Sequence, residues 1–403
     1  MHSQKCEVRC VGSETTVGIA MNRRNLTKTS GLFGCFLFLL THGQAVVATP
    51  KAAPIEFMFY NVYNLFDNEK DQGKDDWTWL PSNYPGKSAQ CKKIPQKHYR
   101  QECFETNWTT PYLKLKVAQL RKAITHNQRS MVPDILALCE VENKRIVQAL
   151  AQSMGYDPRA VISADSPDRR GIDVALVYRP SANLKYRSHR EYRLPKNSDL
   201  TKPTRNILEV EFTVGGDQQL FVYVNHWPSQ GAPSPARIVA AKTLRKIIEG
   251  RMKTHPQANI LAAGDFNTIP EDRPHPFHDE LLESNVPGAK LADVHTTFLR
   301  HPKIPADVKK RLAPGTYYYT HGKTWNLLDR FFVNKNLFDG QGLEFYLPSY
   351  RINNPKFLTR PWELRDGSNQ TVMIPNRSNF KTLDPNEAGF SDHFGIRGHL
   401  VIK

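Results

Sequence analysis

The chain has 403 residues, of which 39% are hydrophobic and 23% are charged. This is the composition of a globular protein, and it excludes a disordered or fibrous chain. The formal net charge of +16 suits a polyanionic partner, such as nucleic acid or an anionic membrane surface, although solubility alone can also account for it.

The amino end has the pattern of an export signal. From Met21 onward a basic segment, MNRRNLTKTS, is followed by the apolar run GLFGCFLFLL and then by the small-residue segment THGQAVVATP. This pattern predicts a signal peptide over residues 21–48, and the apolar run is too short to span a membrane comfortably. Residues 1–20 lie upstream of the basic segment, so Met21 is a candidate for the true start. We therefore expect a secreted or periplasmic protein with one domain over residues 49–403.

Three cysteines remain after removal of this segment: Cys91, Cys103 and Cys139. Export implies an oxidising compartment, so we expect a disulfide between Cys91 and Cys103. Cys139 lies inside an apolar run and is predicted to be a buried thiol. The chain has no CxxC pair, which argues against a structural zinc site.

Apolar runs of strand length recur along the chain and alternate with helical periodicity. Several runs are apolar at nearly every position, as expected for strands covered on both faces in a layered α/β protein. The predicted strands are 55–62, 134–141, 172–179, 207–214, 220–227, 259–266, 329–333 and 398–403, and the predicted helices are 112–124, 143–154 and 236–252. Much of the remainder is expected to be loop, and the largest loop covers residues 67–110.

Polar side chains collect where these strands end or begin. They are Asn61, Asn64, Glu140, Glu142, Asn225, His226, Asp265, Asn267, Asp329, Asp392 and His393. Each one alone has an ordinary explanation as a turn residue or a solvated carboxylate. Six strand ends that all carry a carboxylate, an amide or an imidazole are harder to attribute to turns. Open α/β sheets form their sites at the carboxyl ends of the strands, so we expect one site here.

The residue types in this set match the needs of phosphate ester hydrolysis. A hard divalent cation requires oxygen ligands, which Glu140 and Asn61 supply, with Asp392 as an additional metal or water contact. Such a cation polarises a phosphoryl oxygen and stabilises the leaving group. The chain has no GxSxG element, so a serine hydrolase is a poor alternative.

The remaining residues suit the proton transfers of the same reaction. Asp265 can accept the proton of the attacking water, and Asn267 can orient water or phosphate. His226 and His393 can donate hydrogen bonds to the phosphate and to the leaving oxygen. A histidine in this role needs a carboxylate partner that fixes its tautomer, and Asp329 is the candidate.

Seven stretches together resemble the endonuclease/exonuclease/phosphatase superfamily, in the order typical of that family. They are FYNVYNLFD, ALCEVEN, RRGIDVALVYR, VNHWPS, AAGDFNT, GTYYYTHGKTWNLLDRFFV and FSDHFGI, spanning roughly residues 55–400. The resemblance implies a four-layer α/β sandwich, with two packed central β-sheets and helices on the outer faces. It also implies a magnesium enzyme, with Mn²⁺ or Ca²⁺ as alternatives, and supports the roles assigned above.

Two further residues are expected on the substrate side of the site. Arg170, in RRGIDVALVYR, is predicted to contact the substrate, and a salt bridge within its loop is the alternative reading. Asn225, beside His226, is predicted to bind the substrate as well. The long segment 67–110 departs from the family pattern and receives no role from the sequence.

Three functions remain open at this point. An exported nuclease is favoured by the basic charge, the export signal and the aromatic residues available for stacking. A phospholipid or phosphoinositide phosphoesterase is the alternative, and it should show an exposed apolar hairpin, for which residues 362–380 are too polar. A non-catalytic binding module would show gaps in the set of site residues, and the set is complete. We expect a monomer that acts on nucleic acid, or alternatively on membrane lipid, and that has no stable protein partner.

Overall fold

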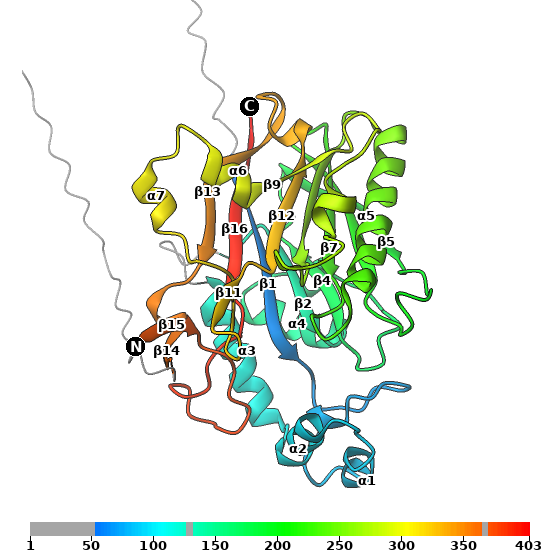
Figure 1. Cartoon of the computed structure of the whole chain (residues 1–403), viewed down its shortest axis with the longest axis vertical. Helices are drawn as coiled ribbons and strands as arrows, with labels where there is room; N and C mark the ends of the chain where they lie inside the picture. Colours follow the sequence, from blue (N-terminus) through cyan, green and yellow to red (C-terminus); the bar gives the residue numbers. More distant parts are fainter. Residues whose placement is uncertain (1–52, 126–131, 365–369) are drawn as a thin grey trace, which may run out of the picture. The chain divides into compact units, whose positions relative to one another are not determined.

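The computed structural model describes residues 53–125, 132–364 and 370–403. Two six-stranded β-sheets lie face to face in it, and helices cover their outer faces (Figure 1). The predicted signal peptide lies outside the described residues, so export stays a prediction. No helix of the described part has the length and apolarity needed to cross a bilayer.

The first sheet joins the beginning of the described chain to its end. Its strand order is β13-β16-β1-β2-β4-β3. The pairing of β1 with β2 is parallel, and the other pairings in this sheet are antiparallel. The strands are β1 (Ile55–Leu65), β2 (Ile135–Val141), β3 (Val161–Ser163), β4 (Asp173–Tyr178), β13 (Leu343–Asn353) and β16 (Gly395–Ile402).

The second sheet uses the middle of the chain. Its strand order is β5-β6-β7-β8-β12-β9, and only β7 and β8 run parallel. The strands are β5 (Leu184–Tyr192), β6 (Ile207–Val214), β7 (Gln218–His226), β8 (Asn259–Asp265), β9 (Leu291–Asp293) and β12 (Asp329–Asn334). Two small hairpins lie outside both sheets: β10 (Tyr317–Tyr319) with β11 (Thr324–Asn326), and β14 (Thr359–Glu363) with β15 (Thr371–Pro375).

Alternation of side chains along the strands produces the layers. In β7, Val222 and Val224 face the first sheet, whereas Phe221 and Tyr223 belong to a separate apolar cluster beneath a long helix. Between the sheets, the rings of Phe57 and Phe331 meet edge to face, with centroids 5.2 Å apart. Both faces of the central strands are therefore apolar, which is why their sequences are almost continuously hydrophobic.

Helices form the two outer layers. Apolar residues of α3 and α4 join the core on the side of the first sheet, and α5 covers the second sheet. The helices are α1 (Lys87–Cys91), α2 (Lys97–Glu105), α3 (Thr110–Thr125), α4 (Lys144–Ser153), α5 (Ser234–Thr254), α6 (Val294–Arg300) and α7 (Ala306–Lys310). The predicted four-layer sandwich is confirmed.

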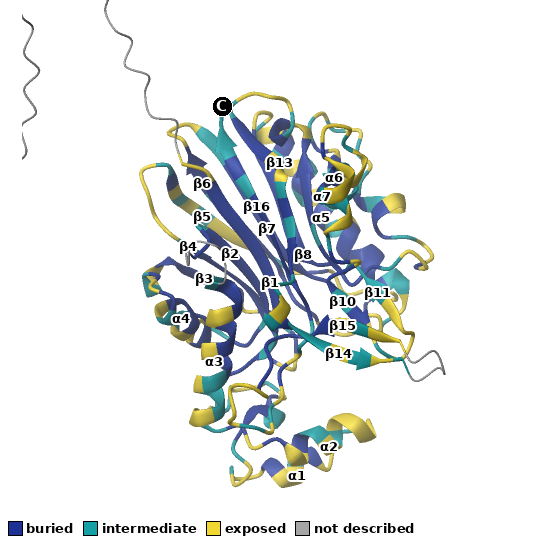
Figure 2. Cartoon of the chain, turned by 90° about the vertical axis from the view of Figure 1, so that its left-hand side faces the viewer, coloured by how far each residue is buried: buried dark blue, intermediate teal, exposed yellow. Residues whose placement is uncertain are grey.

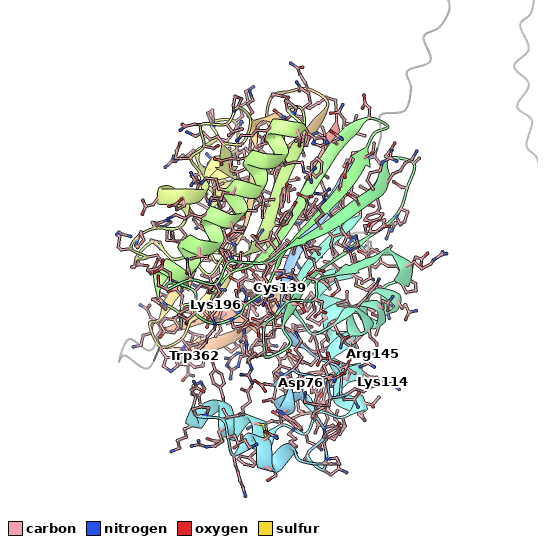
Figure 3. All side chains as sticks on the ribbon, turned by 90° about the vertical axis from the view of Figure 1, so that its right-hand side faces the viewer. Asp76, Lys114, Cys139, Arg145, Lys196 and Trp362 are labelled. Atoms are coloured by element: carbon pink, nitrogen blue, oxygen red, sulfur yellow. A yellow bond between two sulfur atoms is a disulfide. The ribbon has the colours of Figure 1, made fainter. Side chains whose placement is uncertain are left out.

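The segment 67–110 differs from its prediction as plain loop. It contains α1 and α2, and the expected disulfide joins Cys91 to Cys103 with their Cα atoms 5.6 Å apart. Both helices are short and largely exposed (Figure 2), so they leave little apolar periodicity in the sequence. Cys139 is a buried free cysteine on β2, as predicted (Figure 3).

Candidate active site

The site forms where neighbouring strands of the two sheets end together. In the second sheet, Asp265 at the end of β8 is in register with His226 on β7 and with Asp329 on β12. Asn61 lies on β1 in the first sheet, and its amide nitrogen is 3.1 Å from Asp265 Oδ2. This hydrogen bond joins the two sheets, so the strand pairings place these side chains at one point.

Asp329 and His393 form a buried couple. His393 Nδ1 is 2.7 Å from Asp329 Oδ2. Burial lowers the pKa of His393, but the carboxylates of Asp329, Asp265 and Asp392 raise it, and the net shift is well above the usual value. Ser391 fixes the loop, because its hydroxyl donates to the carbonyl of Asn61 (2.7 Å) and accepts from the backbone amide of His393 (3.2 Å). The imidazolium therefore has a fixed orientation.

Asp265 is the carboxylate around which the other groups gather. Its Oδ2 lies 3.8 Å from His226 Nε2 and 3.9 Å from His393 Nε2. Burial raises the pKa of Asp265 to about 7; His393 opposes this shift, and the charges of Asp329 and Glu140 add to it. A carboxylate with a pKa near neutrality is suited to accept a proton at physiological pH.

Glu140 faces this group from β2. Its Oε1 accepts from the Asn61 amide at 3.2 Å and lies 4.0 Å from His226 Nε2, and its Oε2 accepts from the backbone amide of Asn64 at 3.1 Å. Glu140 and Asn64 have φ values of 61° and 57°, a left-handed conformation that non-glycine residues seldom adopt. Such strain is retained where surrounding structure fixes a functional side chain.

His226 and Asn267 complete the predicted set from the second sheet. Burial lowers the pKa of His226 well below its usual value, and the charges of Arg205, Arg170 and His393 add to the effect. The ring is therefore neutral, and its Nε2 faces two carboxylates. Asn267 donates from its backbone to Asp265 Oδ1 (3.0 Å) and from its side chain to the carbonyl of Trp227 (3.2 Å).

The donor set fits a divalent cation. Within the described residues, the buried oxygens Asp329 Oδ1 and Asp392 Oδ1 have no hydrogen-bond partner. Potential ligand atoms of Asp265, Asp329 and His393 lie within 4.8 Å of one another. Burial raises the pKa of Asp392 to about 6, and the charge of Glu140 contributes in the same direction. Several carboxylates crowded in a buried site are stabilised by a hard cation with oxygen ligands.

Two ligand sets are available in this cluster. The Asp329–His393 hydrogen bond already occupies two members of the first set, which leaves Glu140 and Asp392 as the better candidates. The Asn61 side-chain oxygen accepts from the backbone amide of Tyr63 at 3.0 Å, so its amide nitrogen faces the carboxylates. Metal ligation by Asn61 stays a prediction that requires this side chain to turn.

The two predicted substrate residues lie in different surroundings. The side chain of Arg170 is 59% exposed and pairs with Asp168 at 3.3 Å; its charge also acts on His226. It is thus both a loop ion pair and a cation near the site. Asn225 is fully buried, donates to the carbonyls of Tyr223 and Ala263, and accepts from Trp227. These bonds support the end of β7, and substrate contact by Asn225 stays a prediction.

Two basic residues that support the site were missed in the sequence. Arg205 is buried and donates to the carbonyls of His226 (3.1 Å) and Trp227 (2.5 Å). Lys116 on α3 donates to the carbonyl of Phe390 (2.8 Å), just before the loop that carries His393. Lys116 lies four residues before Leu120, on the border of the apolar face of the helix. Its burial could therefore have been expected from the sequence. Arg205 precedes a strand and gives no such signal.

A family model described as the endonuclease/exonuclease/phosphatase family matches residues 93–401 of this chain. The chain belongs to the endonuclease/exonuclease/phosphatase family. Hydrolases of this family act on phosphoester bonds and depend on a divalent metal, and the Asp265, Asp329 and His393 group is one place in this member that could hold such an ion.

Solved structures of low sequence identity resemble this family member. The human nocturnin catalytic domain with bound sulfate is 14% identical and has a TM-score of 0.47, covering 87% of this chain and 95% of its own. An endonuclease/exonuclease/phosphatase from Bacteroides vulgatus is 14% identical, with a TM-score of 0.49 and coverage of 87% and 100%. A mannosyl-6-phosphatase from Bacteroides thetaiotaomicron is 13% identical, with a TM-score of 0.45 and coverage of 86% and 100%. No curated protein sequence matches the chain.

Proposed function

We propose that this chain is an exported, magnesium-dependent nuclease that hydrolyses phosphodiester bonds of nucleic acid. The observation that carries the proposal is the convergence of Asn61, Glu140, His226, Asp265 and the Asp329–His393 couple on one point. A chain that kept only the fold would have no need for these buried and mutually repelling carboxylates.

The chain's own residues can perform the proton transfers of this reaction. Asp265, with its pKa near 7, accepts the proton of the attacking water while Asn267 orients that water. His393, held by Asp329, donates a hydrogen bond to the phosphate as charge develops on it. The neutral ring of His226 donates toward the leaving oxygen.

Glu140 and Asp392 are the residues proposed to hold the metal. The chemistry supplied by a divalent cation in such a site is polarisation of a phosphoryl oxygen and stabilisation of the leaving group. Because the four nearby carboxylates of Glu140, Asp265, Asp329 and Asp392 repel one another, binding of the cation should also stabilise the folded protein.

A basic cavity supports a polyanionic substrate. The cavity has a volume of about 240 Å³ and is lined by Arg193, Lys196 and Lys202 together with leucine and proline side chains; Figure 3 labels Lys196. Thr204, in its wall, is adjacent in sequence to Arg205, which binds the carbonyl of His226. Cations in this position can bind phosphates beyond the scissile one.

The alternative of a phospholipid phosphoesterase calls for an exposed apolar hairpin. β14 and β15 form a two-stranded hairpin although the sequence of this region is polar, and Met373 on β15 is 47% exposed. A single exposed apolar side chain is common on soluble proteins, so this hairpin does not favour the alternative over the nuclease.

A plasmid assay separates these functions. Residues 49–403 are incubated with supercoiled plasmid and magnesium, beside an EDTA control and the His393→Ala variant. We expect metal-dependent nicking that the variant lacks. If folded protein leaves both the plasmid and a single-stranded oligonucleotide intact but hydrolyses sphingomyelin in vesicles, the nuclease proposal is wrong and the alternative replaces it.

A further inference from the structure

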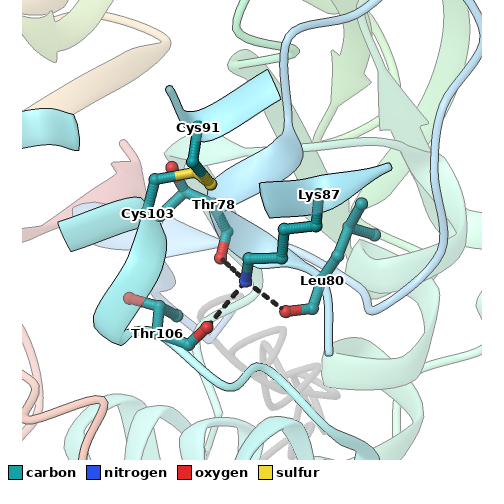
Figure 4. Close-up of a disulfide and its surroundings, with 6 residues drawn as sticks. All are labelled: Thr78, Leu80, Lys87, Cys91, Cys103 and Thr106. Atoms are coloured by element: carbon teal, nitrogen blue, oxygen red, sulfur yellow. Dashed lines mark hydrogen bonds between the residues drawn. A yellow bond between two sulfur atoms is a disulfide. The ribbon is translucent and has the colours of Figure 1, made fainter. Parts of the chain in front are cut away.

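The segment 67–110, which we call the wall, is held in one conformation by specific contacts. Its disulfide links α1 to α2, and Lys87 on α1 is almost fully buried. The Lys87 ammonium donates to the carbonyls of Thr78 (3.1 Å), Leu80 (2.6 Å) and Thr106 (2.6 Å) (Figure 4). A covalent link and a buried cation thus hold two short helices that lack a hydrophobic core of their own.

This wall packs against one of the two loops that flank the site, the one that carries Arg170. The backbone amide of Asp75 donates to the carbonyl of Arg169 at 2.6 Å, and the Arg169 side chain pairs with Asp75 at 3.1 Å. Lys74 donates to the carbonyl of Ser166 at 2.7 Å. Asp76, labelled in Figure 3, belongs to the same segment. Arg169 therefore joins this loop to the wall.

The wall also packs against the loop that leads to Asp392 and His393. The rings of Trp79 and Phe380 meet at 4.8 Å, and Lys381 pairs with Glu105 at 2.5 Å. In Figures 1 and 2, α1 and α2 lie beyond the carboxyl end of β1, the end at which Asn61 lies. The wall therefore spans the two loops on the side where a substrate approaches.

The exposed surface of α2 carries an aromatic ring on a helix with charges of both signs, Lys97 and Arg100 as well as Glu102 and Glu105. Tyr99 is 54% exposed, and its ring centroid lies 3.9 Å from that of His98. Tyr99 belongs to the helix whose Glu105 pairs with Lys381 at 2.5 Å, on the loop that leads to Asp392 and His393.

We propose that this wall binds the nucleotide next to the scissile phosphate, with Tyr99 stacking on its base and Arg170 binding its phosphate. A base in a duplex is stacked on both faces, so only an unpaired base offers its ring to a tyrosine. The wall therefore selects single-stranded or unpaired nucleic acid over duplex. This inference rests on the proposed nuclease function.

The test compares Tyr99→Ala and Tyr99→Phe with the unmodified chain on three substrates. They are a single-stranded oligonucleotide, the same sequence as a duplex, and bis(4-nitrophenyl) phosphate, which has no nucleobase. We expect the unmodified chain to prefer the single strand. In Tyr99→Ala, the ratio of kcat/KM for the oligonucleotide to that for the small diester should fall about tenfold, mainly through KM, because stacking of one base contributes that order of affinity. Tyr99→Phe, which keeps the ring, should retain the ratio.

Tyr346→Ala is the matched control. Tyr346 is 49% exposed, and it pairs with His399 on β16, away from His393; its loss should leave the ratio unchanged. An unchanged ratio in Tyr99→Ala, or equal cleavage of duplex and single strand, overturns the inference while the nuclease function stands. Cleavage of the small diester without any cleavage of nucleic acid overturns the nuclease function itself.

Discussion

The strand-end site and the wall formed by residues 67–110 are held in place by different means. The site rests on two six-stranded sheets, where register alone brings His226, Asp265 and Asp329 side by side. The wall has two short helices and depends on a disulfide, on the buried Lys87 and on a small apolar cluster that includes Trp79 and Trp108. We infer that the sheets fix the positions of the reacting groups, whereas the separately stabilised wall determines which substrates reach them.

The largest effect should come from the site. His393→Ala removes the imidazolium that Asp329 orients, and turnover of any phosphodiester should fall about 1,000-fold or more. Circular dichroism and thermal unfolding should show a folded protein. His399→Ala, a change on β16 outside the site, is the control and should keep its activity. A loss of activity that is equal in both variants would mean that the site has been assigned wrongly.

A smaller effect is expected when the wall loses its disulfide. The bond closes a separation of 12 residues, for which the loss is about 3 kcal/mol of stability. Cys91→Ser/Cys103→Ser should therefore unfold at lower denaturant, and it should lose selectivity between single strand and duplex more than it loses turnover of bis(4-nitrophenyl) phosphate. Dithiothreitol should reproduce the effect in the unmodified chain and change nothing in the variant. Equal loss on all substrates would show that the two regions are not separable.

The stability of the folded protein should depend on pH through a buried carboxylate near the contact between the two regions. Asp173 on β4 is buried and accepts from the backbone amide of Ser166 in the Arg170 loop (3.0 Å); burial raises its pKa to about 7. The folded state thus binds a proton that the unfolded state has released, and stability falls as pH rises from about 4 to 7. Between pH 5 and pH 8 this group should contribute a loss of roughly 2–3 kcal/mol.

Asp173→Asn should flatten that dependence, because the amide cannot ionise and its oxygen can still accept from Ser166. Thermal unfolding measured at pH 5 and pH 8 checks this expectation. The same difference between the two pH values in variant and unmodified chain would show that Asp173 is not the responsible group.

The smallest expected effect concerns the metal. Glu140→Gln keeps the shape of the side chain but removes one negative charge, so the magnesium concentration for half-maximal activity should rise about tenfold. Titration of activity against magnesium measures the shift, with Glu211→Gln on β6 as a matched change outside the site. An unchanged magnesium requirement would move the metal to the Asp265, Asp329 and His393 group.

The central strands and the site could be predicted because their sequence signals are strong. β2 and β8 are buried along most of their length, and each carries a carboxylate of the candidate site at its last or penultimate residue. β5 was missed because it is an edge strand with mostly exposed, charged residues, and β13 because its apolar pattern is broken by Pro348 and by a shift in register. Arg205 could not be found, because its role depends on carbonyls of residues about twenty positions away.

The pairing of β1 with β16 has a consequence for biosynthesis. Ile55 lies opposite Leu400, and Asn61 depends on Ser391 for its backbone contact, so the earliest and latest parts of the catalytic domain must meet before the site exists. A nascent chain that has not yet released residues near 400 has β1 and β2 but lacks the Asp392–His393 loop. Contacts of such long sequence separation form slowly. The chain should therefore stay without hydrolytic activity until the residues near 400 have left the ribosome, and under the proposed nuclease function this delay protects the messenger RNA and the ribosome that produce it.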